Sequence, residues 1–127
     1  MIVDDDHEAT RIIGLVTAKK FPDATISSAE NGKQGLEHFA KYRPDIVITD
    51  IRMPVMDGIQ MAREIKSLKD DTHFIVLTAF NDKESLAEFR EIGFYDYLIN
   101  PIEFTKLLAG LERCIFEIRQ GRVAKSC

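Results

Sequence analysis

The side chains that can do chemistry stand at the ends of apolar segments. Asp4 and Asp5 follow the short apolar start of the chain, and Asp50 follows the β-branched run IVIT. Thr78 follows the run FIVL, and Asn100 ends the segment YDYLIN. Such runs are typical of strands that are buried on both faces of a parallel sheet. Because ligands of open α/β sheets bind beyond the carboxyl ends of the strands, we expect these side chains to meet in one pocket.

The carboxylates determine what this pocket can bind. Like charges that converge on one pocket repel each other unless a cation binds there or a proton is taken up. Oxygen ligands and few protein contacts suit Mg²⁺, which keeps several waters in its shell. The pattern therefore predicts a weak Mg²⁺ site. Structural explanations stay open for single residues: Asp6 as a helix N-cap, Thr78 as an ordinary strand residue and Tyr97 as a half-buried packing residue.

The elements that must position these side chains are five strands alternating with five helices. The expected strands are residues 1–3, 23–29, 45–49, 74–77 and 95–99. The expected helices are residues 7–20, a segment from the 31–32 loop to about 42, and residues 58–68, 83–92 and 103–120. This alternation predicts an α/β fold whose parallel sheet is covered on both faces. The helix over 83–92 has the sparsest apolar stripe, so we expect it to be the most loosely held element.

Composition and charge narrow the class of protein. The chain has 127 residues, enough for one domain, and a formal net charge of −4, which does not indicate a nucleic-acid-binding surface. It contains no apolar run of membrane-spanning length and no signal peptide. Cys114 and Cys127 have neither metal-site nor redox spacing, so we expect a reducing, cytoplasmic setting. We expect one domain over residues 1–120, with residues 121–127 as a tail or the start of a linker.

Four segments together resemble the receiver domain of bacterial two-component response regulators, the CheY-like family. They are VDDD at 3–6, TDIRMP at 49–54 with MDG at 56–58, LTA at 77–79 and DYLINP at 96–101. The resemblance covers nearly the whole chain, from Ile2 to about Glu117. It implies a flavodoxin-like, doubly wound (βα)5 fold with the strand order 2-1-3-4-5.

The resemblance also implies a chemistry for the pocket. Asp50 would accept a phosphoryl group from the phosphohistidine of a histidine kinase or a histidine phosphotransfer protein. Asp5 and Asp50 would hold Mg²⁺ through their carboxylates, the backbone carbonyl of Arg52 would be a third ligand, and Asp4 would act through water. Mn²⁺ or Ca²⁺ would substitute for Mg²⁺. The protein would be a signalling domain rather than an enzyme.

A switch follows from the same resemblance. Thr78 would donate its hydroxyl to a new phosphoryl oxygen, and Tyr97 would fill the space that the moving segment leaves. The helix over 83–92, the strand over 95–99 and the last helix would form the surface that a downstream effector reads. Gly110 stands where DNA-binding receivers that dimerise through this face carry an arginine, so we expect a monomer or weak dimer. We expect no direct contact with nucleic acid or membrane, in a chain that either stands alone or is part of a longer regulator.

Asn100 departs from the family pattern, because receiver domains usually carry a lysine directly before the proline that is Pro101 here. A lysine brings a full positive charge to the phosphoryl oxygens, whereas an asparagine amide donates a hydrogen bond without charge. We expect Mg²⁺ binding to survive and activation by phosphorylation to be weakened. One alternative is a receiver-like interaction module that works without phosphorylation, and in another Asn100 is only a turn residue before Pro101.

Two further classes share parts of the pattern. Asp-nucleophile phosphatases of the haloacid dehalogenase type have a site that resembles D-x-D, in which the second aspartate acts as acid and base. The segment Asp50-Ile51-Arg52 lacks this second aspartate. A flavin- or nucleotide-binding domain needs a polar or glycine-rich phosphate loop after its first strand. The acidic run at residues 4–6 would repel a phosphate there unless a metal intervened. Both classes therefore fit the sequence less well than a phosphoacceptor domain.

Overall fold

A five-stranded parallel sheet with helices on both faces forms the protein. The computed structural model describes residues 1–126, with side chains for residues 1–121. The strands are β1 (Ile2–Val3), β2 (Ser28–Ala29), β3 (Ile46–Asp50), β4 (His73–Thr78) and β5 (Asp96–Ile99). The helices are α1 (His7–Lys20), α2 (Gly32–Tyr42), α3 (Gly58–Leu68), α4 (Lys83–Ile92) and α5 (Phe104–Ser126). The sheet order is β2-β1-β3-β4-β5, which confirms the predicted flavodoxin-like topology.

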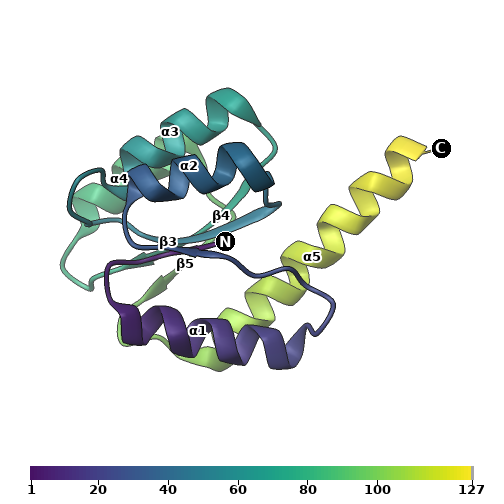
Figure 1. Cartoon of the computed structure of the whole chain (residues 1–127), viewed down its shortest axis with the longest axis horizontal. Helices are drawn as coiled ribbons and strands as arrows, with labels where there is room; N and C mark the ends of the chain where they lie inside the picture. Colours follow the sequence, from purple (N-terminus) through teal and green to yellow (C-terminus); the bar gives the residue numbers. More distant parts are fainter. Residues whose placement is uncertain (127) are drawn as a thin grey trace.

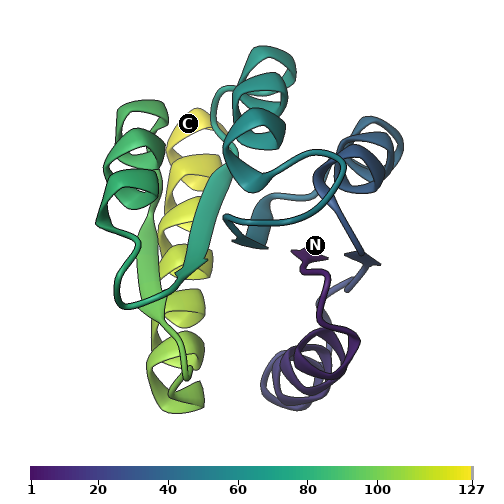
Figure 2. The same cartoon turned by 90° about the vertical axis from the view of Figure 1, so that its left-hand side faces the viewer.

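The helices form two layers around the sheet. Helices α1 and α5 cover one face, and α2, α3 and α4 cover the other (Figures 1 and 2). Successive strand residues point to opposite faces, so each strand serves two cores. On β4, Phe74 and Val76 join the core under α2, α3 and α4, whereas Ile75 and Leu77 join the core under α1 and α5. The sheet is thus packed against helices on both faces.

The predicted helix starts depend on short polar side chains. The carboxylate of Asp6 accepts from the backbone N–H groups of Glu8 and Ala9, at 3.0 and 3.2 Å, and so caps α1. Asp82 caps α4 by accepting from the N–H of Ser85. The Asp6 cap confirms the structural explanation that the sequence analysis left open for this residue. In both caps a short acidic side chain satisfies N–H groups that have no partner inside the helix.

Two boundaries differ from the sequence prediction by more than one residue. The second strand was expected over residues 23–29, but only Ser28–Ala29 is strand. Its partner β1 has two residues, and these pair with Ser28 and Ala29, so a longer ladder has no partner. The last helix was expected to end near residue 120, but α5 continues to Ser126. An exposed glycine inside a helix costs only about 1 kcal/mol, which is too little to end α5 at Gly121.

Helix α4 is held by few apolar side chains, as its sequence predicts. Phe89 is its one fully buried residue, and Leu86 and Ile92 are partly buried against the same core. That α4 is the most loosely held element stays a prediction. Within residues 1–126, no helix is both long enough and apolar enough to cross a membrane. Cys114 is buried and free, and Cys127 lies outside the described residues.

Candidate functional site

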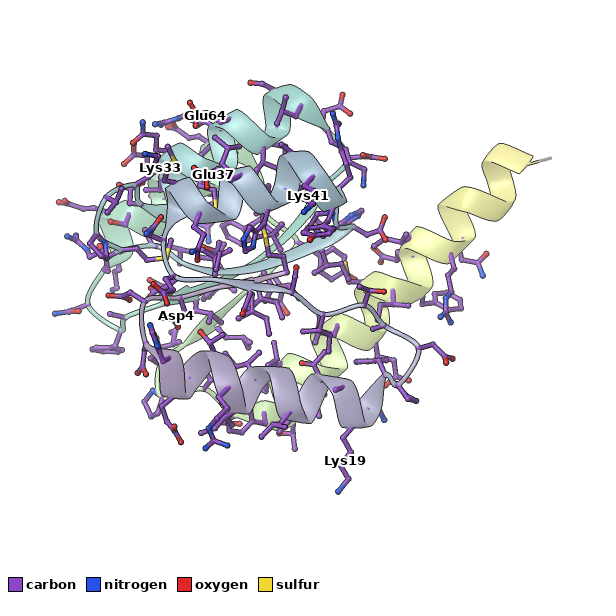
Figure 3. All side chains as sticks on the ribbon, in the orientation of Figure 1. Asp4, Lys19, Lys33, Glu37, Lys41 and Glu64 are labelled. Carbon is purple, nitrogen blue, oxygen red and sulfur yellow. The ribbon has the colours of Figure 1, made fainter. Side chains whose placement is uncertain are left out.

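Three carboxylates converge at the carboxyl edge of the sheet. Ligand oxygens of Asp4, Asp5 and Asp50 all lie within 4.8 Å of one another. Asp4 and Asp5 come from the segment that joins β1 to α1, and Asp50 is the last residue of β3. Figure 3 labels Asp4 at this end of the sheet, beside the start of α1. The parallel pairing of β1 with β3 brings the two segments together, as the sequence predicts.

Asp50 is surrounded by groups that act on its charge in opposite directions. Its carboxylate accepts the N–H of Ile51 at 2.7 Å and also accepts the N–H of Arg52. Burial and the nearby charges of Asp4 and Asp5 outweigh these hydrogen bonds and raise the pKa of Asp50 to about 6. At neutral pH most of the Asp50 side chains are therefore ionised, although their charge is poorly compensated.

Asp4 is the most buried member of the cluster. It is 7% exposed, and its carboxylate accepts the N–H of Asp6 at 2.9 Å. Burial, with smaller contributions from the charges of Asp5 and Asp6, raises the pKa of Asp4. All three carboxylates offer the hard oxygen ligands that Mg²⁺ prefers, and a cation would relieve their mutual repulsion. The residues present therefore fit a Mg²⁺ ion.

The loop after Asp50 is tightly folded at both of its ends. A Cβ at Gly58 would overlap the carbonyl oxygen of Asp50, so only glycine allows the start of α3 to pack against the end of β3. Val55 has a φ of 73°, a left-handed conformation that is strained for a β-branched residue. No pattern in the sequence indicated either constraint. The MDG segment indicated a turn, but no pattern marked Val55 as the residue with positive φ.

Thr78 lies on the strand next to Asp50. Asp50 pairs with Leu77 in the β3–β4 ladder, so Thr78 is one residue beyond that pair. Its side chain is buried, and its hydroxyl donates to the carbonyl of Ala79 at a long 3.4 Å. Asn100 follows β5 beside it, because the Asn100 N–H donates to the carbonyl of Thr78 at 2.9 Å. Both residues thus lie at the sheet edge that carries the carboxylates.

Tyr97 lies apart from this group. It pairs with Val76 in the β4–β5 ladder, and it is 39% exposed. Its ring makes an edge contact with Phe94, with 5.9 Å between centroids. The structure therefore brings Asp4, Asp5 and Asp50 together, places Thr78 and Asn100 at the same edge, and leaves Tyr97 on the outer surface.

Arg52 takes part in an interaction that the sequence analysis missed. Its Nε and Nη2 donate to the two carboxylate oxygens of Asp82, at 2.7 and 3.1 Å. This ion pair joins the loop after β3 to the start of α4. No sequence pattern indicates a contact between long side chains in separate loops. The sequence predicts a role only for the backbone carbonyl of Arg52, and the position of that carbonyl as a metal ligand stays a prediction.

The fold and the site together define a class of protein. A doubly wound parallel sheet in the order 2-1-3-4-5, with an acidic cluster and a threonine at its carboxyl edge, is the arrangement of a receiver domain. Residues 1–112 match the family described as the response regulator receiver domain. The chain therefore belongs to the receiver domains of two-component response regulators.

Individual relatives agree with this assignment. Regulatory protein AtoC of Escherichia coli is 36% identical over 115 residues, which are 91% of this chain and 24% of that protein. The transcriptional regulatory protein YesN of Bacillus subtilis is 30% identical, over 88% of this chain and 30% of that protein. The solved N-terminal domain of a Wolinella succinogenes protein, WS1339, has a TM-score of 0.85 and 33% identity, and the match covers 98% of this chain and 95% of that domain. The chain spans about a quarter of the length of the first of these relatives.

Proposed function

We propose that the protein is a phosphoacceptor receiver and that Asp50 takes the phosphoryl group. The convergence of Asp4, Asp5 and Asp50 within 4.8 Å carries this proposal, because phosphoryl transfer depends mainly on positioning and on neutralising charge. The donor would be the phosphohistidine of a histidine kinase or a histidine phosphotransfer protein. An Asp50 oxygen forms a bond to phosphorus while the phosphorus–nitrogen bond breaks. The imidazole nitrogen keeps the electron pair and is protonated from solvent.

Mg²⁺ is the cofactor that we assign to this reaction. Asp5 and Asp50 would bind it through their carboxylates, Arg52 through its carbonyl oxygen and Asp4 through water, and Mn²⁺ or Ca²⁺ would substitute. The cation supplies positive charge beside the acceptor and the transferred group. The chain's own contribution is to hold a largely ionised Asp50 at the end of β3, beside Asp4 and Asp5. This is a signalling reaction on the protein itself rather than turnover of a substrate.

The readout would begin at Thr78. Its hydroxyl makes only a long hydrogen bond to Ala79 and can turn toward a phosphoryl oxygen at little cost. Movement of this segment would open space for Tyr97, which is exposed in the present structure. The surface of α4, β5 and α5 would then change for a downstream effector. We place this signalling in the cytoplasm, which is consistent with the free Cys114.

Asn100 favours a second candidate function. An amide in the usual lysine position brings no charge to the phosphoryl group, which favours a receiver-like interaction module that works without phosphorylation. The presence of Asp5, Asp50 and Thr78 supports the first candidate more strongly. We therefore infer a working acceptor whose activated state is less populated than in receivers with a lysine.

Amide NMR with Mg²⁺ and fluoroberyllate, a phosphoryl mimic, tests the choice between the two. If phosphorylation of Asp50 switches the surface, the amide signals near Asp50, Thr78 and Tyr97 should all shift. Shifts that stay within the metal loop would favour the interaction module. Asp50→Asn is the control variant, since it keeps the shape of the side chain and should abolish fluoroberyllate binding.

A further inference from the structure

Arg52 and Asp82 form a two-point ion pair between the loop after β3 and helix α4. The guanidinium Nε lies 2.7 Å from Oδ2, and Nη2 lies 3.1 Å from Oδ1, which is the fork geometry of strong arginine–carboxylate pairs. The Asp82 side chain is only 9% exposed, whereas the Arg52 side chain is 76% exposed. The Asp82 side chain is therefore held in place, whereas the Arg52 side chain lies on the surface and can move.

The Asp82 carboxylate makes two kinds of contact. Its carboxylate caps α4 by accepting from the N–H of Ser85, and it also binds the guanidinium. The hydrogen bond from Arg52 is the main reason that the pKa of Asp82 is lowered to about 2. The start of α4 is thus tied to the loop that leads away from Asp50.

The main chain of Arg52 is in direct contact with the acceptor. The N–H of Arg52 donates to the Asp50 carboxylate, so the flexible side chain begins beside the atom that would carry phosphate. A phosphoryl group brings roughly −1.5 to −2 charges and three acceptor oxygens, which suit the same guanidinium fork. Asn100, in the position where receivers usually have a lysine, offers no charge to that group.

We propose that Arg52 is a mobile cation of this site, which leaves Asp82 and pairs with the phosphoryl group once Asp50 carries it. Arg52 would then supply the positive charge that Asn100 does not supply. The loss of the ion pair would also release the start of α4 from the loop after β3, and α4 is the helix with few buried side chains. This inference rests on the proposed function of Asp50, and it assigns a regulatory contact to a side chain of the same site.

Two substitutions separate a mobile cation from a static clamp. Arg52→Gln removes the charge and should weaken fluoroberyllate binding in Mg²⁺ by about tenfold, the size expected for one charge-assisted hydrogen-bonded pair. Asp82→Asn keeps the helix cap but removes the ion pair and leaves the guanidinium only its long hydrogen bond to Ser85, at 3.4 Å, so it should tighten binding severalfold. A clamp that only supports the loop predicts that both changes weaken binding, because both break the same ion pair.

Matched variants complete the experiment. Arg63→Gln breaks the exposed pair of Arg63 with Glu88 between α3 and α4, with the same loss of charge, and should leave the dissociation constant unchanged. Arg52→Lys should keep part of the affinity. Asn100→Lys in the Arg52→Gln background should restore binding, since the missing charge returns from the neighbouring strand. Thermal unfolding confirms that each variant is folded.

Amide NMR titration of the intact chain provides the dissociation constants. Opposite effects of Arg52→Gln and Asp82→Asn, with rescue by Asn100→Lys, are the expected result. Equal effects of the two changes, or no effect in a chain that binds fluoroberyllate normally, would overturn the role of Arg52 and leave the role of Asp50 intact. If the unsubstituted chain does not bind fluoroberyllate, both proposals fail.

Discussion

At the scale of single residues, Asp50 lies where its charge is unfavourable. Burial and two neighbouring carboxylates raise its pKa to about 6, whereas in the unfolded chain it has its ordinary value of 3.8. The folded state therefore binds more protons than the unfolded state between these two values. Stability that is present at low pH is lost as the pH rises through this window. The ionised form of the proposed acceptor therefore destabilises the metal-free fold.

Asp50→Asn should therefore stabilise the metal-free protein at pH 7.5. The raised pKa of Asp50 corresponds to about 3 kcal/mol at this pH, and partial exposure reduces this to about 1 kcal/mol. The melting temperature should rise by about 3–6 °C in EDTA. The gain should shrink at pH 5, where the original side chain is protonated, and in Mg²⁺, which stabilises only the charged site. Circular dichroism melts of both chains under the three conditions measure this, and equal melting temperatures in EDTA would contradict it.

Val55 has a strained backbone conformation in the loop beside Asp50, the proposed acceptor. Its φ of 73° places a β-branched side chain in the left-handed region, and the side chain is 77% exposed, so replacing it loses little packing. Val55→Gly should raise the free energy of unfolding by about 0.5–1 kcal/mol, after allowance for the greater freedom of glycine in the unfolded chain. Urea denaturation measures the change. Val55→Ala keeps a Cβ and should gain less, and a larger gain from alanine would refute the strain argument.

Substitution of Asn100 tests directly whether the site lacks the positive charge that a lysine would bring to this position. Asn100→Lys should raise the rate of phosphoryl uptake from a small-molecule donor by about tenfold, because an ammonium group pairs with the phosphoryl oxygens. Asn100→Gln lengthens the side chain without charge and should leave the rate nearly unchanged. Mass spectrometry of the intact chain follows the uptake. No increase with lysine would sink the charge argument for this position.

At the scale of elements, a chain of aromatic rings links the core to Tyr97. Phe74 contacts Phe89, Phe89 contacts Phe94 and Phe94 contacts Tyr97, with centroids 5.6, 6.1 and 5.9 Å apart and edge-to-face geometry throughout. Each such pair contributes about 0.5–1.5 kcal/mol beyond the burial of its surface. Phe94 thus supports the exposed orientation of Tyr97, and it does so from the segment between α4 and β5.

Phe94→Leu should weaken that support while it keeps an apolar side chain in the core. The orientations of Tyr97 should shift away from the exposed one before any phosphoryl mimic is added. The chain has three tyrosines, so fluorotyrosine labelling gives three ¹⁹F signals, and Tyr42 on α2 serves as the internal reference. The Tyr97 signal should move in Phe94→Leu and stay in place in Phe116→Leu, a matched change on the exposed side of α5. An unmoved Tyr97 signal would show that Phe94 has no such role.

At the scale of the whole molecule, the sequence was sufficient to predict the strand order of the sheet and the convergence of the acidic cluster. The carboxyl ends of parallel strands must meet at one edge, so the positions of Asp5 and Asp50 after apolar runs predicted their convergence. The predicted length of β2 was wrong, because the length of this strand depends on its partner β1, which provides only two residues for pairing. The pairing of Arg52 with Asp82 has no sequence signal, since it depends on how two loops fold in space. The same is true of the positive φ of Val55.

Helix α5 leads away from the rest of the protein (Figure 1). It has 23 residues, follows β5 in the chain and belongs to the proposed switch surface. At about 1.5 Å per residue, the helix is roughly 35 Å long. A tilt of about 10° at its base would move its far end by about 6 Å, so such a helix would amplify a small movement. A rearrangement too small to alter the fold near Asp50 would thus become a displacement as large as a side chain at a distant point.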